Sequence, residues 1–131
     1  VVTNGYICRE PLSDLILYID AMNIDLKAFT EGFYKKIRGD LETVKSTIEY
    51  CASRCHIEVT TLIIPGENDS EEEMKLLSSW LASVNPEIPL HITRFFPGWH
   101  MMDREATPVE TIYRLSDIAR NNLRYVYEGN C

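Results

Sequence analysis

The chain has 131 residues, of which 45% are apolar and 25% charged, a balance that suits one globular domain with its own core. Twenty acidic and thirteen basic residues give a formal charge of −7, which argues against nucleic acid and anionic membrane as partners. No stretch approaches the ~20 apolar residues that cross a bilayer, and the opening VVTNGY shows no signal-peptide pattern. We expect one domain over residues 1–131.

The four cysteines are too few and too scattered for a disulfide framework, which favours a reducing compartment and predicts a cytoplasmic location. Cys51 and Cys55 are one helical turn apart within a helical pattern, so they would share a helix face. His56 adjoins the pair, but no second cluster completes a zinc site. Two small packed side chains are therefore the favoured interpretation.

The hydrophobic pattern predicts strands and helices in strict alternation. In chain order, these are a strand at 1–6, a helix at 11–19, a strand at 21–29, a helix at 40–55, a strand at 56–66, a helix at 70–84, a strand at 89–96, a helix at 108–122 and a strand at 123–130.

Helix starts are visible at three of these boundaries. Asp40 is a suitable N-cap, and Ser70 with Glu73 fits the capping-box pattern. The Thr-Pro-Val-Glu run at 107–110 repeats the box, with proline at the first helical position. We expect all three caps to form.

Five strands joined by helices of this length predict parallel crossovers. The pattern fits either a doubly wound sheet or part of a β/α barrel. The chain lacks G-x-G-x-x-G, a Walker A loop, G-x-S-x-G and H-E-x-x-H. In both architectures the chemistry lies at the carboxyl ends of the strands, so we sought the site there.

Polar side chains occur at four predicted strand ends, where the candidate site residues are Asn4, Asp25, Lys27, Thr60 and Arg94. Asp25 and Lys27 are two residues apart on one strand and would point to the same face. They could hold a carboxylate or phosphate together with a cation or hydroxyl, or form a structural ion pair. Arg94 has a structural alternative too, which is to cover apolar surface with its stem.

The remaining polar and aromatic candidates have less specific interpretations. His91 would lie on the same face of its strand as Thr93 and Phe95. We interpret it as an interior histidine with a hydrogen-bond partner rather than a metal ligand. We interpret His56 as a surface residue. Residues 99–102 (Trp-His-Met-Met) fit either a lid over an apolar substrate or a loop packed on the rim.

Five motifs, in register over nearly the whole chain, resemble the radical S-adenosylmethionine (SAM) enzymes of the AmmeMemoRadiSam system, which are related to the pyruvate-formate-lyase-activating enzymes. The motifs are TNGY, NIDLK, TTLIIPGENDSEEE, HITRFFP followed by a helix that begins TP, and YVYEGN. The resemblance implies a partial (β/α)6 TIM-like barrel that binds SAM and a [4Fe–4S] cluster. The cluster cleaves SAM to a 5′-deoxyadenosyl radical that abstracts hydrogen, in some members from a protein substrate.

The motifs for the cluster and for the methionine amine, C-x-x-x-C-x-x-C and Gly-Gly-Glu, are missing from this sequence. Cys51-x-x-x-Cys55 has Glu58 where the third cysteine would stand. We therefore interpret the chain as the carboxyl-terminal portion of the barrel, without a cluster of its own. Cys131 would begin the cysteine-bearing tail that often follows in this family.

The resemblance implies roles for the matching positions only. Lys27 would contact the methionine carboxylate, with Asp25 near a cation or the ribose, and Asn4 would face the cofactor. Two positions depart from the activating enzymes: Val2 replaces an aspartate and Thr60 replaces an arginine. Arg94 is a candidate for supplying the missing positive charge.

Three functions follow from these observations. The leading hypothesis is a SAM-dependent radical enzyme of which this chain supplies part of the SAM pocket and is inactive alone. A non-catalytic half-barrel that binds a nucleotide or a protein is the alternative, and a Schiff-base lyase using Lys27 is a third. The first strand has no proline or lysine at residues 1–7 to protect its edge, so we also expect the chain to self-associate.

Overall fold

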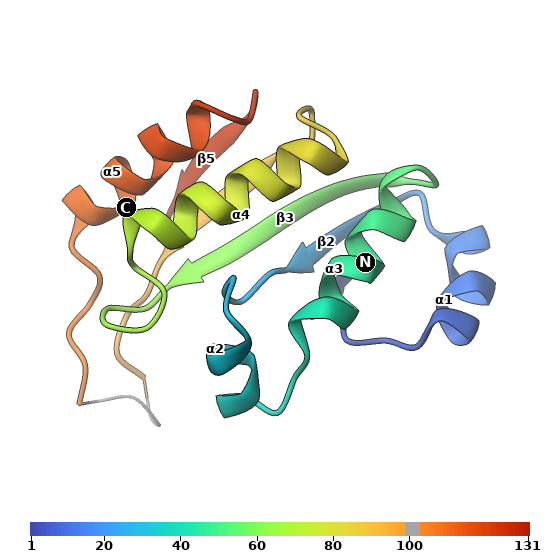
Figure 1. Ribbon diagram of the computed structural model, residues 1–131, viewed down its shortest axis with the longest axis horizontal. Coiled ribbons are helices and arrows are strands. Elements are labelled where there is room, and N and C mark those ends of the chain that lie inside the picture. Colours follow the sequence, from blue (N-terminus) through green and yellow to red (C-terminus); the bar gives the residue numbers. More distant parts are fainter. Residues whose placement is uncertain (99–102) are drawn as a thin grey trace.

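The spatial order of the strands follows their order in the chain. In the computed structural model, which describes residues 1–98 and 103–131, five parallel strands form one sheet in the order β1-β2-β3-β4-β5 (Figure 1). The strands are β1 Val2–Thr3, β2 Ala21–Asp25, β3 His56–Ile63, β4 Leu90–Arg94 and β5 Val126–Gly129. The helices are α1 Arg9–Leu15, its 3-10 continuation η1 Ile16–Tyr18, α2 Glu31–Lys36, α3 Leu41–Ala52, α4 Glu71–Val84 and α5 Val109–Arg120.

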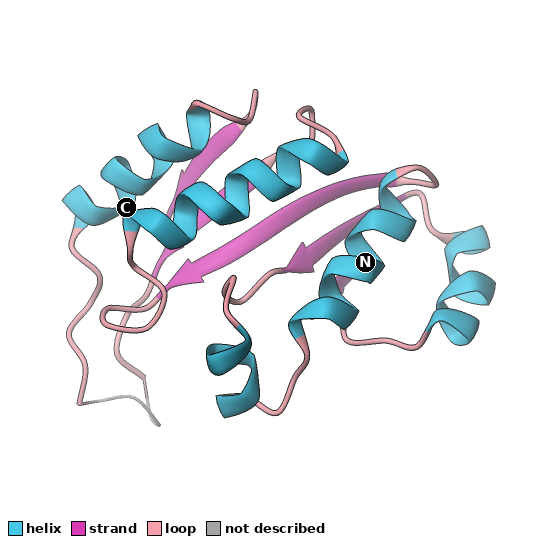
Figure 2. Cartoon of the chain, in the orientation of Figure 1, coloured by secondary structure: helices cyan, strands magenta, loops and turns pink. Residues whose placement is uncertain are grey.

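The longer helices α3, α4 and α5 lie against one face of this sheet, and α3 and α4, labelled in Figure 1, cross in front of the strands in Figure 2. Alternate strand residues such as Ile24, Val59 and Ile92 are fully buried beneath them and join the helix stripes in one core. A doubly wound sheet would interrupt the strand order and carry helices on both faces. Between the two architectures that the sequence allowed, the structure therefore has the winding of a β/α barrel.

The predicted starts of α3 and α4 are confirmed. The Asp40 carboxylate accepts a hydrogen bond from the Thr43 amide at 2.8 Å, and the Ser70 hydroxyl accepts one from the Glu73 amide at 3.2 Å. Among the described residues the Glu73 carboxylate makes no hydrogen bond back to the Ser70 amide, so the cap forms without the second half of the capping box.

The third predicted cap is wrong. Pro108 is the residue that precedes α5, and no side chain caps this helix. Thr107 is fully buried, and its hydroxyl donates to the Ile63 carbonyl at 2.5 Å and accepts from the Phe95 amide at 3.2 Å. The hydroxyl is thus used to join the ends of β3 and β4.

The helix boundaries differ from the sequence prediction by one to three residues, and one short helix was not predicted. α1 begins at Arg9, two residues earlier than expected, with Pro11 in its first turn where no amide donor is needed. α3 ends at Ala52, so Cys55 lies beyond the helix. The short helix α2 was not predicted, since its six residues include Gly32 and its only local signal is the N-cap Thr30.

None of the helices within residues 1–98 and 103–131 has the length and apolarity that crossing a bilayer requires.

Candidate functional site

The face of the sheet opposite the helices is mostly polar. We call it the inner face; its polar and aromatic side chains are Asn23, Asp25, His56, Glu58, Thr60, His91, Thr93 and Tyr127, and the apolar Val2, Ala21 and Leu62 share the face. Asp25, Thr60, His91 and Tyr127 stand opposite one another across β2, β3, β4 and β5. In a closed barrel such positions hold packed layers of branched apolar side chains. A polar inner face is instead suited to a polar ligand.

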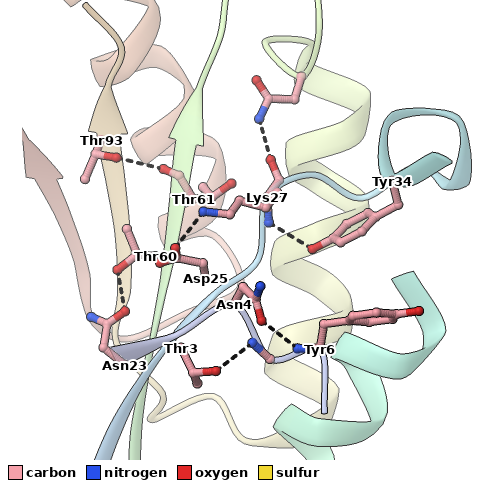
Figure 3. A network of polar contacts seen from close by, with 12 residues as sticks. Thr3, Asn4, Tyr6, Asn23, Asp25, Lys27, Tyr34, Thr60, Thr61 and Thr93 are labelled. Atoms are coloured by element: carbon pink, nitrogen blue, oxygen red, sulfur yellow. Dashed lines mark hydrogen bonds and ion pairs between the residues drawn. The ribbon is translucent and has the colours of Figure 1, made fainter. Parts of the chain in front are cut away.

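Asp25 and Lys27 form an ion pair at the carboxyl end of β2, as Figure 3 shows. The Lys27 ammonium lies 2.6 Å from Asp25 Oδ2, and the two side chains are 39% and 29% exposed. The predicted shared face is therefore confirmed. An ammonium carries three donors, so the bond to Asp25 leaves two for a ligand.

A cleft of about 400 Å³ opens beside this ion pair. Asn4 and Lys27 line it together with aromatic side chains from two segments, Tyr6 after β1 and Phe33 and Tyr34 of α2. The Asn4 side chain accepts a hydrogen bond from the Tyr6 amide at 3.0 Å, which fixes the turn that presents both residues. The cleft thus combines a cation, an amide and aromatic surface.

Thr60 and Arg94, the other two predicted site residues, lie in different places. Thr60 is on the inner face in register with Asp25, and its hydroxyl donates to the Asn23 side chain at 2.9 Å. Arg94 is in register with the buried Ile63, on the helix-covered side of the sheet. Its guanidinium donates to the Thr107 carbonyl and stands over the Phe96 ring. The structure brings Asn4, Asp25, Lys27 and Thr60 together and holds Arg94 apart.

Two buried side chains that the sequence did not single out contact the backbone of Lys27. The Tyr34 hydroxyl accepts from the Lys27 amide at 3.0 Å, and Asn68 Nδ2 donates to the Lys27 carbonyl at 2.8 Å. Burial raises the pKa of Tyr34 to about 12, so the hydroxyl stays protonated. Asn68 belongs to the quoted PGEND run, but no local pattern indicates contact with a residue 41 positions earlier.

His91 has the hydrogen-bond partner expected of it. Its Nε2 lies 2.7 Å from Glu58 Oε1, and its ring stacks on Tyr127 with centroids 5.4 Å apart. The hydrogen bond from His91 keeps the pKa of Glu58 below its usual value. His56 is exposed, as predicted, and lies 3.4 Å from the other Glu58 oxygen.

Within the described residues, no group of three histidine, cysteine, aspartate or glutamate side chains is arranged to hold a metal ion. Cys8 and Cys131 are exposed, Cys51 is buried and Cys55 half-buried, and all four are free thiols. Burial raises the Cys51 pKa to about 11, which disfavours the thiolate that metals require. These residues do not fit an iron–sulfur cluster. Residues 99–102, which the sequence analysis interprets as a lid or a packed loop, lie outside the described residues.

Comparison with known proteins gives one relative by sequence. The chain is 38% identical over 134 residues to an uncharacterized protein, MJ0808, of Methanocaldococcus jannaschii. The match covers 99% of this chain and 39% of the relative, so the chain spans about two fifths of that protein's length. No protein-family model matches the chain.

Two solved structures are similar in fold. A domain of pyruvate-formate lyase-activating enzyme from Bacteroides vulgatus matches with a TM-score of 0.84 at 17% identity, over 98% of this chain and 79% of that one. Archaeal TYW1 matches with a TM-score of 0.62 at 20% identity, over 94% of this chain and 39% of that one. The partial-barrel fold implied by the sequence motifs is thereby confirmed: the chain folds as this activating-enzyme domain does.

Proposed function

We propose that the cleft and the adjoining inner face bind SAM, and that the chain is part of a radical SAM enzyme of the AmmeMemoRadiSam type. The observation that carries the proposal is the Lys27–Asp25 ion pair at the edge of an aromatic-lined cleft of about 400 Å³. The similarity in fold to an activating-enzyme domain and the motif resemblance support it.

The residues of the cleft have the donors and acceptors that the parts of SAM require. The Lys27 ammonium binds the methionine carboxylate through a charge-assisted hydrogen bond, and the free oxygen of Asp25 accepts from the ligand's ammonium or ribose. Asn4 offers an amide, and Tyr6 and Phe33 offer rings on which a planar base can stack. Arg94 does not contact the ligand, because Thr107 and Phe96 hold its guanidinium; its positive charge acts only over a distance.

The task of this chain in the proposed enzyme is binding and orientation. In radical SAM enzymes the [4Fe–4S] cluster and SAM together supply a carbon radical that abstracts hydrogen. The residues described in this chain do not fit the cluster, so we assign them no step at it. Lys27 and Asp25 anchor the amino-acid end of SAM, which sets the direction in which the rest of the ligand extends toward the aromatic rings of the cleft.

Calorimetric titration of the chain with SAM and, separately, with adenosine tests the proposal. Lys27→Ala should weaken SAM binding by about 1–3 kcal/mol, roughly 5- to 150-fold, and leave adenosine binding unchanged, because adenosine has no carboxylate. Lys45→Ala is the matched control, since Lys45 is on α3 and pairs with Glu42. Equal SAM affinity in the wild type and Lys27→Ala would make the pair a structural ion pair, and no SAM binding at all would refute the proposal.

A further inference from the structure

Lys27 lies two residues past Asp25, the last residue of β2, where the sheet stops supporting the backbone. The Leu26 amide still donates to the Thr60 carbonyl at 2.9 Å, but Lys27 has no strand partner. Backbone groups that leave a sheet in a buried position need other partners. Here side chains supply them on both sides of Lys27.

The Asn68 side chain makes three hydrogen bonds, which use all of its donors. Its Nδ2 donates to the carbonyls of Lys27 and Leu62, each at 2.8 Å, and its Oδ1 accepts from the Ile64 amide at 2.7 Å. Asn68 is 3% exposed and does not line the cleft. It therefore connects the carboxyl end of β3 to the backbone of Lys27 and has no ligand to touch.

On the other side, Tyr34 holds the Lys27 amide through its buried hydroxyl. Tyr34 is 2% exposed, and its ring is part of the core. The amide and the carbonyl of Lys27 thus each have one fixed partner, one from α2 and one from the turn between β3 and α4. Figure 3 shows the bond from the Lys27 amide to the Tyr34 hydroxyl.

We infer that Asn68 is a positioning residue for Lys27, assisted by Tyr34, and this inference rests on the proposed SAM site. A lysine side chain has four rotatable bonds, and its starting direction is set by the backbone. Fixing the two peptide groups of Lys27 directs its side chain along the inner face, where the ammonium meets Asp25. Asn68 of the PGEND run therefore acts on the binding site through the backbone of Lys27. Its own side chain does not contact the ligand.

A double-mutant cycle distinguishes positioning from general structural support. If Asn68 acts through Lys27, Asn68→Ala should weaken SAM binding by about 5-fold or more and leave adenosine binding unchanged. In the Lys27→Ala background, the same Asn68→Ala substitution should then cause no further loss. Additive losses, or equal losses for SAM and adenosine, would overturn the inference. Asn122→Ala is the matched control, because Asn122 bonds Ser78 on the helix side.

Asn68→Ala could unfold the chain, so Tyr34→Phe provides a second, milder test. It removes only the acceptor of the Lys27 amide, and we expect exchange of the Lys27 amide hydrogen to accelerate about 10-fold or more, whereas that of Leu26 stays slow. This measurement needs no ligand, so it still tests the clamp if the wild type fails to bind SAM. Unchanged Lys27 exchange in Tyr34→Phe would contradict the clamp itself.

Discussion

Substitution by alanine should have opposite effects on stability at Gly5 and at Gly32. Gly5 follows Asn4 with φ of +72°, a left-handed conformation that other residues rarely adopt. A Cβ added there would lie 2.9 Å from Ile24 Cγ2 and 3.1 Å from Val44 Cγ1. Both neighbours are fully buried, so neither can move away into solvent.

The cost of Gly5→Ala has two parts. The left-handed backbone costs about 1–2 kcal/mol for a residue with a Cβ, and overpacking a filled core costs about 1–3 kcal/mol. The smaller entropy of the unfolded alanine chain returns about 0.4–1 kcal/mol. We expect a net destabilisation of about 1–5 kcal/mol, a large part of the stability of an ordinary domain.

Gly32→Ala is the matched control, because Gly32 lies within α2 and an added Cβ would meet no atom within 4 Å. Gly32 is the second residue of α2, in its first turn, so the higher helix propensity of alanine should stabilise the chain by up to about 1 kcal/mol. Urea unfolding followed by circular dichroism gives both free energies of unfolding, provided that the slopes agree. If both variants shift the midpoint in the same direction, the assignment of strain and close packing to Gly5 fails.

Three further predictions concern ionisation and the sheet edge. Burial raises the native pKa of Tyr34 to about 12, so the stability that Tyr34 contributes is complete below the unfolded pKa of ~10. The free energy of unfolding should fall by about 1 kcal/mol between roughly pH 9 and 11. Urea titrations of Tyr34→Phe should not show this loss. The hydrogen bond from His91 lowers the native pKa of Glu58, so the stability that Glu58 contributes is present above its unfolded pKa and is lost as the pH falls through its native pKa. If Glu58→Gln retains the acid dependence of the wild type, Glu58 makes no such contribution. Val2 is 79% exposed on β1, which pairs only with β2 among the described strands, so the chain should self-associate at ~100 μM and Val2→Lys should reduce the light scattering; a monomeric wild type would contradict this.

Local patterns in the sequence were sufficient for most elements. Buried and partly exposed residues alternate through β3 as its β-branched pattern predicts, and α3 and α4 begin after the predicted caps Asp40 and Ser70. The shared face of Asp25 and Lys27 follows from the two-residue period of a strand. These features depend on residues a few positions apart, so they can be predicted from the sequence alone.

Contacts between distant segments required the tertiary structure. Thr107 has the local pattern of a cap, yet its hydroxyl bonds Ile63, 44 residues earlier, because the ends of β3 and β4 bring unpaired backbone groups to it. Arg94 stands at a strand end like the other candidates, but it shares the face of Leu90 and Ile92, and only the packing of the helices showed that this face is the covered one. Asn68 reaches Lys27 only because β2 and β3 are neighbours. The periodicity of each segment determined its secondary structure. The order and register of the strands decided which side chains share the site. The sequence alone does not show these contacts, because buried backbone groups bond to whichever partner the packing places beside them.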